Sequence, residues 1–162
     1  MPYIVDGHNL IPKIPGLSLR AIDDEMQLIE LLQEFCRVQR KALEVYFDNA
    51  PPGQARLRKY GWVTAYFIRQ GTSADQAIRN RLEKLGRATS DWIVVSSDLA
   101  VQAAARRSGA TVVKAEDFPR QMRKTLQGIG QASEKGADTI LKPDEVEAWL
   151  KFFEGESQNG ED

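Results

Sequence analysis

The run Trp92-Ile93-Val94-Val95-Ser96-Ser97-Asp98 joins four apolar residues to two serines and an aspartate. Four consecutive apolar residues are typical of a central parallel strand that helices cover on both faces. The serines and the aspartate that follow are typical of a helix start. We therefore predict a strand over 92–95 that leads directly into a helix, which is the repeating unit of an α/β fold.

The same alternation continues on both sides of this run. Further strands are predicted at Tyr3–Val5, Leu43–Phe47, Trp62–Ile68 and Thr111–Val113, with helices over about 23–41, 73–86, 98–108 and 117–126. The pattern predicts an α/β fold with a central, mainly parallel sheet of about five strands and helices on both faces. Trp62 is expected to belong to the core.

We assign residues 1–127 to one domain, because 162 residues is the size of a single domain. Residues 128–135 are expected to form a flexible joint, and Pro143 is expected to start a last helix that packs on the same domain. The segment 128–154 thus completes the domain, and 155–162 is expected to be a disordered tail.

The amino-acid composition restricts the kinds of catalytic site that this chain could have. No apolar run approaches the roughly 18 residues of a membrane span, and no basic and apolar leader opens the chain, so we expect no membrane association. The single cysteine, Cys36, excludes an internal disulfide and fits the reducing cytoplasm. His8 is the only histidine. Hydrolytic chemistry in this chain must therefore rest mainly on carboxylates.

The net charge of −1 conceals a strongly uneven distribution. Residues 51–90 carry 8 basic and 2 acidic side chains, whereas residues 131–162 carry 3 basic and 9 acidic ones. A basic middle between acidic ends is one form that a polyanion-binding face takes in a nearly neutral protein. Solvated helix faces would produce the same pattern, so the charges alone leave both interpretations open.

Four aspartates occur where the predicted strands end. Asp6, Asp48 and Asp98 follow strands, and Asp75 lies in the first turn of a helix. Each alone is explained by a turn or a helix cap. Together they fall at the carboxyl edge of the sheet, where open α/β sheets bind ligands. Carboxylates gathered there repel one another, and Mg²⁺ or Mn²⁺ would relieve that repulsion and activate water for phosphodiester hydrolysis.

These segments resemble one known family. Val5-Asp6-Gly7-His8-Asn9, Tyr46-Phe47-Asp48, Thr72-Ser73-Ala74-Asp75-Gln76-Ala77-Ile78 and Val95-Ser96-Ser97-Asp98 occur in the order seen in NYN domains, a branch of the PIN-like nucleases. The chain looks like the YacP-like group over roughly residues 2–125. The resemblance implies a PIN-like three-layer sandwich and a Mg²⁺- or Mn²⁺-dependent endoribonuclease. Its partner would be RNA, with ribosome-associated messenger RNA as one candidate and a homodimer left open.

Carried over by motif, the resemblance assigns metal binding and catalysis to Asp6, Asp75 and Asp98. Asn9 and Asp48 would border the site, and Ser97 would orient Asp98 or a water molecule there.

Basic residues near these acids are candidates for RNA binding. Those in the loop after the second strand are flanked by aromatic residues, as phosphate contact with base stacking requires. The basic residues on the helix after Asp75 are expected to point away from the core and to guide an RNA strand toward the acids. The set is Arg56, Arg58, Lys59, Arg79, Arg81 and Arg87. His8 has two interpretations, an RNA contact or proton carrier and a structural histidine.

Two other functions remain open from the sequence. A non-catalytic RNA-binding module of the same fold would bind RNA with strong salt dependence and release no products. An aspartate-based phosphoacceptor or phosphatase domain ranks third, because the position two residues after Asp6 is His8 and not a second acid.

Overall fold

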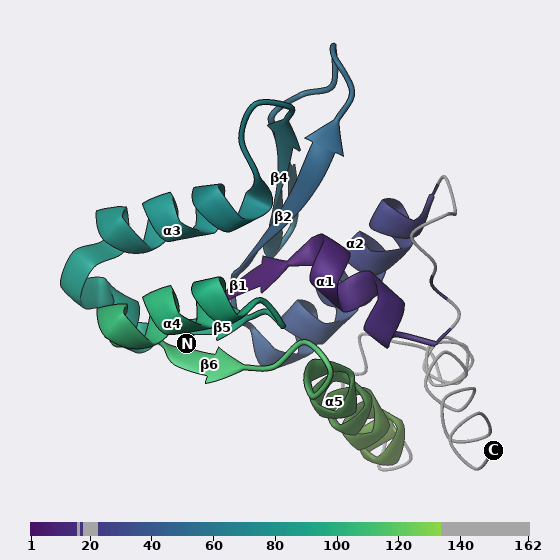
Figure 1. The fold of residues 1–162 in the computed structure, drawn as a ribbon. Helices are drawn as coiled ribbons and strands as arrows, with labels where there is room; N and C mark the ends of the chain where they lie inside the picture. Colours follow the sequence, from purple (N-terminus) through teal and green to yellow (C-terminus); the bar gives the residue numbers. More distant parts are fainter. Residues whose placement is uncertain (16, 18–22, 134–162) are drawn as a thin grey trace, which may run out of the picture.

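The computed structural model describes residues 1–15, 17 and 23–133, and in them six strands form one sheet. The strand order is β3-β4-β2-β1-β5-β6, and every neighbouring pair is parallel except the antiparallel pair β3 and β4. The bounds are Tyr3–Asp6 for β1, Leu43–Ala50 for β2, Leu57–Tyr60 for β3, Val63–Arg69 for β4, Ile93–Val95 for β5 and Thr111–Val113 for β6. The predicted mainly parallel sheet is confirmed, with six strands instead of about five (Figure 1).

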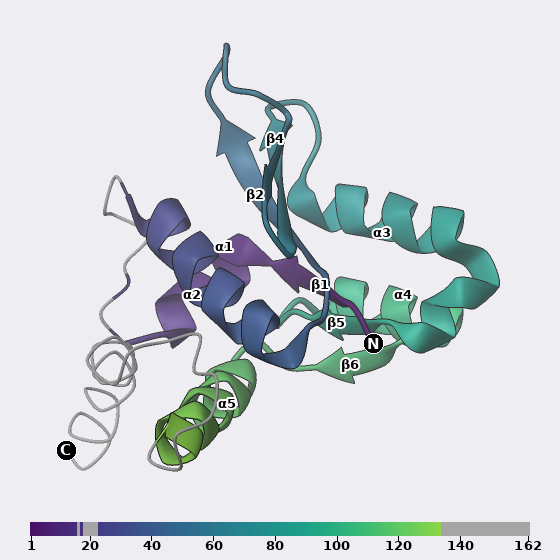
Figure 2. The same cartoon turned by 180° about the vertical axis from the view of Figure 1, so that it is seen from behind.

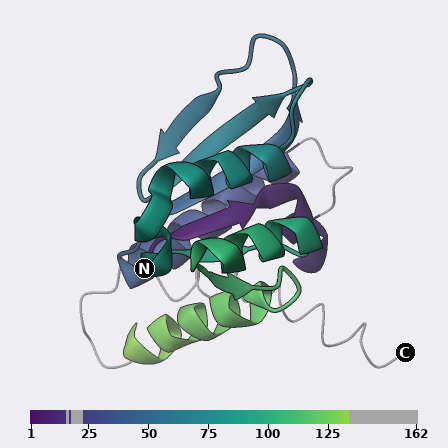
Figure 3. The same ribbon diagram turned by 60° about the vertical axis from the view of Figure 1, so that its left-hand side comes forward.

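Helices cover both faces of the sheet and complete the predicted three layers. On one face lie α2, Asp24–Gln39, and α5, Phe118–Ser133 (Figure 2). On the other face α3, Ala74–Leu85, and α4, Leu99–Ser108, lie side by side (Figure 3). The short helix α1, Gly7–Leu10, and the 3-10 turns η1, Ile11–Lys13, and η2, Gly86–Asp91, complete the described elements. No helix in the described ranges is long and apolar enough to cross a membrane.

Strand β1 shows why the sequence folds into three layers. Tyr3 and Val5 are buried in the core under α2 and α5, while Ile4 between them is buried in the core under α3 and α4. Side chains of a strand alternate between the two faces of a sheet, so a strand with apolar residues on both faces needs helices on both faces. The apolar run thus fixes β1 in the middle of the sheet.

A β-bulge interrupts β2 beside the sheet edge. Phe47 pairs with Phe67 and Ala50 pairs with Arg69, so β2 holds one residue more than β4 over this stretch. Asn49 accommodates the extra residue with a left-handed backbone, at φ 58°. A bulge changes the direction of neighbouring side chains, and here it sets the direction of the Asp48 carboxylate.

Three expectations differ from the structure. Trp62 is 44% exposed, because the chain reverses between β3 and β4 at this residue and turns its ring outward. The edge strand β3 lies in a segment for which the sequence pattern predicts a loop. The joint expected from residue 128 is helical as far as Ser133, because α5 continues across this point. The last helix from Pro143 and the tail 155–162 lie outside the described residues, and the domain division stays a prediction.

Candidate active site

The carboxyl ends of β1, β2 and β5 are neighbours in the sheet, and α3 and α4 begin beside them. This edge gathers the four aspartates singled out from the sequence. Asp6 ends β1, Asp48 lies at the bulge of β2, Asp75 is the second residue of α3, and Asp98 is the N-cap of α4. The predicted placement of the four carboxylates at one edge of the sheet therefore agrees with the structure.

Gly7 lets the chain turn directly from β1 into α1 above this edge. A Cβ atom at residue 7 would lie 2.3 Å from Cε1 of Phe47, which is closer than atoms can approach. Only glycine leaves room for the buried Phe47 ring at this position. The tight turn places Asn9 over the end of β1.

Asp6 is the most buried of the four acids, at 4% exposure. Its Oδ2 accepts a hydrogen bond from Asn9 Nδ2 at 2.8 Å, and its buried Oδ1 has no hydrogen-bond partner among the described residues. Burial, and then the negative charge of Asp48, raise the pKa of Asp6 to about 6. A cation next to Oδ1 would stabilise the ionised form.

Asn9 connects the ends of β1 and β5. Its Oδ1 accepts hydrogen bonds from both the backbone N–H and the hydroxyl of Ser97, while its amide group donates to Asp6. The Ser97 hydroxyl therefore bonds Asn9, and its expected role toward Asp98 or a water molecule stays a prediction. Ser96 contacts Asp98 directly, because its buried hydroxyl accepts a hydrogen bond from the Asp98 backbone N–H at 3.0 Å. The sequence signal for Ser96 is its place directly after the buried strand.

His8 joins the sheet edge to α2. Its Nδ1 accepts a hydrogen bond from the Asp48 backbone N–H at 3.3 Å, and its Nε2 lies 2.7 Å from Glu25 Oε2. An accepting Nδ1 leaves the ring proton on Nε2, which then donates to Glu25. The hydrogen bond to Glu25 also raises the pKa of His8. The geometry thus gives His8 a structural role at the end of β2, and Glu25, 17 residues away along the chain, has no local signal that predicts this contact.

Asp48 holds the start of α3. Its Oδ1 accepts a hydrogen bond from the Ala74 backbone N–H, and Ser73 Oγ accepts one from Gln76 N at 3.1 Å. The helix start predicted at Ser73 is therefore confirmed, with the Ser73 side chain as N-cap. The Gln76 side chain donates to Asn80 Oδ1 at 3.0 Å, and no described hydrogen bond returns from it to Ser73. Asp48 borders the site as expected and also fixes the position of Asp75 on the first turn of α3.

Asp75 and Asp98 face a common cation. Arg79 donates to both oxygens of Asp75, from Nε to Oδ1 at 3.1 Å and from Nη2 to Oδ2 at 2.7 Å. These bonds raise the pKa of Arg79, and the charge of Asp98 raises it further. Asp98 uses Oδ1 to accept from Ala100 N at 2.8 Å and Val101 N at 3.3 Å.

The charge of Asp48 therefore acts on Asp6, and Arg79 binds Asp75 within reach of the charge of Asp98. Within the described ranges, no three His, Cys, Asp or Glu side chains converge closely enough to form a ready metal site. Carboxylate oxygens are nevertheless the ligands that Mg²⁺ and Mn²⁺ prefer. The unpartnered Oδ1 of Asp6, buried beside a second carboxylate, fits such a cation.

The basic residues expected to bind RNA occupy different environments. Arg81 does not point away from the sheet: it donates three hydrogen bonds to the buried Glu44 carboxylate, and its guanidinium lies 5.5 Å from the centre of the Trp92 ring. The Arg81 side chain turns inward because it pairs with Glu44, a buried acid on β2. The residues with exposed side chains are Arg56, Arg58, Lys59 and Arg87.

Comparisons with known proteins agree with this fold. Two crystal structures of Rae1 (YacP) from Bacillus subtilis share the fold. The wild-type protein has a TM-score of 0.69 at 24% identity, covering 98% of this chain and 95% of that one, and a point mutant has 0.68 at 22%, covering 99% of both. A search of curated protein sequences gave no match. A family model described as the YacP-like NYN domain matches residues 3–154. The chain thus belongs to the YacP-like NYN domain family of PIN-like nucleases.

Proposed function

We propose that the chain is an endoribonuclease that hydrolyses RNA phosphodiester bonds with Mg²⁺ or Mn²⁺ held by Asp6, Asp75 and Asp98. The observation that carries the proposal is the buried Asp6 carboxylate, whose Oδ1 has no partner in the described structure. An ionised oxygen left unpaired inside a protein is costly, and a bound cation removes that cost. Membership of a nuclease family supports the same function.

The carboxylates of Asp75 and Asp98 differ in whether an oxygen is free to bind a metal ion. Asp98 receives both helix-capping bonds on Oδ1, which leaves Oδ2 for a ligand. Asp75 has both oxygens on Arg79, so it becomes a ligand only when Arg79 releases it. A divalent ion bound there would lower the pKa of a coordinated water and neutralise charge on a phosphoryl oxygen.

Other residues of the chain orient the acids and would position the RNA strand. Asn9 holds Asp6 through Oδ2, which leaves the buried Oδ1 without a hydrogen bond among the described residues. Arg79, once released from Asp75, would donate to a phosphate oxygen beside the acids. Exposed cations on the β2–β4 segment and on η2 would attract the RNA backbone, and the proposed path consists of Arg56, Arg58, Lys59, Arg79 and Arg87. Arg81 is left out because Glu44 holds it.

A non-catalytic RNA-binding module is the second candidate. The observation that favours it is the ion pair of Arg79 with Asp75, because this pair neutralises one of the three acids without any metal. Such a module would bind RNA through the same cations and leave it intact.

Cleavage of a circular RNA tests the proposal, because a circle has no end for an exonuclease. We expect linear products with Mn²⁺ or Mg²⁺ and none with chelator. Asp6→Asn, Asp75→Asn and Asp98→Asn should each abolish cleavage, whereas Asp91→Asn, which changes an exposed acid of η2, should cleave like the wild type. Binding of the circle without any product under all these conditions would contradict the nuclease and support the second candidate.

The proposal includes ribosome-associated messenger RNA as one source of substrate and the cytoplasm as the compartment. Cys36 is unpaired and buried, and burial raises its thiol pKa to about 12, so it is unreactive. A homodimer stays a prediction, and light scattering at several protein concentrations would test it.

A further inference from the structure

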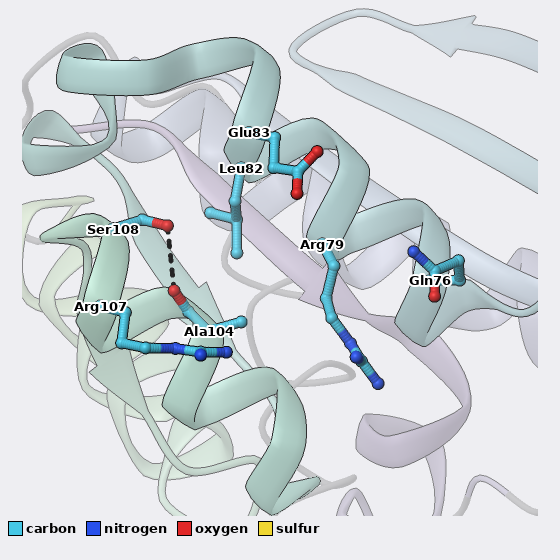
Figure 4. Close-up of a pocket in the computed structure, with 7 residues that line it drawn as sticks. All are labelled: Gln76, Arg79, Leu82, Glu83, Ala104, Arg107 and Ser108. Carbon is cyan, nitrogen blue, oxygen red and sulfur yellow. Dashed lines mark hydrogen bonds between the residues drawn. The ribbon is translucent and has the colours of Figure 1, made fainter.

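A groove of about 350 Å³ lies between α3 and α4 on the outer side of these helices (Figure 4). Its floor is formed by Leu82 and Ala104, which are both buried. Its walls are polar, with Arg79 on α3 and Arg107 on α4. A groove with an apolar floor and two cations on its walls suits a sugar–phosphate chain better than an apolar ligand.

Arg107 is a cation without a partner among the described residues. It lies in the last turn of α4, its side chain is exposed, and no ion pair or hydrogen bond engages its guanidinium. The neighbouring Ser108 hydroxyl turns back onto its own helix and donates to the Ala104 carbonyl at 3.0 Å. The free donors in this part of the groove therefore belong to Arg107, which extends over α4 toward the groove (Figure 4).

The other end of the groove leads to the acids. Arg79 lines the groove and also donates to Asp75, and the charge of Asp98 acts on it. Both α3 and α4 begin at the carboxyl edge of the sheet. The α3 wall of the groove starts at Gln76 in the first turn, and its α4 wall is formed by the C-terminal residues Ala104, Arg107 and Ser108. An RNA strand that lies in it would pass the acids first and reach Arg107 later.

We propose that this groove binds the RNA strand on one side of the cut, with Arg107 contacting a single backbone phosphate. The inference rests on the proposed function and adds a substrate path to it. Glu83, also on the groove wall, opposes the anion and would keep binding weak enough for product to leave.

The spacing along α4 predicts which phosphate Arg107 contacts. Arg107 follows Asp98 by nine residues, which is about 13 Å along a helix axis. A stacked strand advances about 3.4 Å per nucleotide. The contacted phosphate should therefore lie about four nucleotides from the scissile bond, within a window of three to five.

A salt titration of RNA binding in chelator provides the first test. Each phosphate contact to a single strand contributes about 0.7 to the slope of log affinity against log salt, so Arg107→Ala should lower the slope magnitude by about that amount. Arg106→Ala is the matched control, because it removes an exposed arginine from the same turn outside the groove. Glu83→Gln should tighten binding. Equal slopes for Arg107→Ala and Arg106→Ala would overturn the proposal.

Neutral linkages provide the second test. Single methylphosphonates are placed in turn along an RNA with one known cleavage site, and binding is measured in chelator. The wild type should lose affinity at a position three to five nucleotides to one side of the cut, and Arg107→Ala should be insensitive at that position alone. Sensitivity of Arg107→Ala at every position that affects the wild type would overturn the groove while leaving cleavage unaffected. If the protein binds RNA and cleaves none, the methylphosphonates are scanned along a bound RNA without reference to a cut. Loss of a single sensitive position in Arg107→Ala would then retain the groove and overturn the nuclease.

Discussion

Asn9 and Ser97, 88 residues apart in the chain, are joined by two hydrogen bonds that both end on Asn9 Oδ1. The other end of the Asn9 side chain donates to Asp6. One amide group thus ties the loop after β5 to the carboxylate at the end of β1. It does so without contacting any other of the four acids through a described hydrogen bond.

Asn9→Ala should impair both stability and the proposed cleavage. The substitution leaves Asp6 Oδ2 without its donor in a buried position, which costs about 1–3 kcal/mol of unfolding free energy. Urea denaturation measures the loss, and single-turnover cleavage measures the effect on rate. Asn80→Ala is the matched control, because Asn80 is exposed and bonds only Gln76 among the described residues. Equal stability of the two variants would show that the bond to Asp6 contributes nothing.

Asp6 should make the metal-free protein less stable as the pH rises. Its pKa is about 6 in the folded state and 3.8 ordinarily, so the folded state binds the proton more tightly. The unfolding free energy should therefore fall between about pH 4 and pH 6, by about 3 kcal/mol in total from this group. Asp6→Asn removes the titration. The variant should match the wild type near pH 4 and exceed it at pH 7, as measured by urea denaturation in chelator; a constant difference across this range would contradict the shifted pKa.

Arg79→Ala should strengthen binding of Mn²⁺. Arg79 neutralises Asp75 and lies near Asp98, so a cation must compete with it for these acids. Without the guanidinium, a given Mn²⁺ concentration should raise Tm by more than it does in the wild type, because a ligand specific to the folded state stabilises it by mass action. Lys84→Ala, which removes an exposed cation from the same helix, is the control. A smaller Tm shift in Arg79→Ala than in Lys84→Ala would contradict this competition and mean that Arg79 supports the ion site by positioning Asp75.

Arg81→Ala should destabilise the protein without weakening RNA binding. It leaves the Glu44 carboxylate, at 11% side-chain exposure, with the Tyr46 hydroxyl as its remaining described donor. Loss of charged hydrogen bonds of this kind costs about 2 kcal/mol. Chemical denaturation gives the cost, and RNA binding is measured below the transition. A drop in RNA affinity of the folded variant would show that Arg81 contributes to RNA binding after all.

Much of the fold is fixed by local sequence. The runs Tyr3–Val5 and Trp92–Val95 predict central strands because apolar residues on both faces of a strand need two covering layers. Ser73 and Asp98 predict the starts of α3 and α4 because their side chains accept from backbone N–H groups that have no other partner. The order of strands and acids then puts four carboxylates at one sheet edge, as parallel connections require.

The sequence alone thus determined the layers of this protein and the edge that carries its acids, while tertiary structure decided which partner each charged side chain meets. Arg79 binds Asp75 one helical turn away, but Arg81, two residues on, turns inward because Glu44 is buried on a strand 37 residues earlier. Trp62 turns outward because β3 pairs with β4 and makes it a hairpin residue. Local pattern specifies which face a residue occupies within its own element. The charged group or strand that lies opposite this residue comes from a distant part of the chain, so only the tertiary fold determines which one it is.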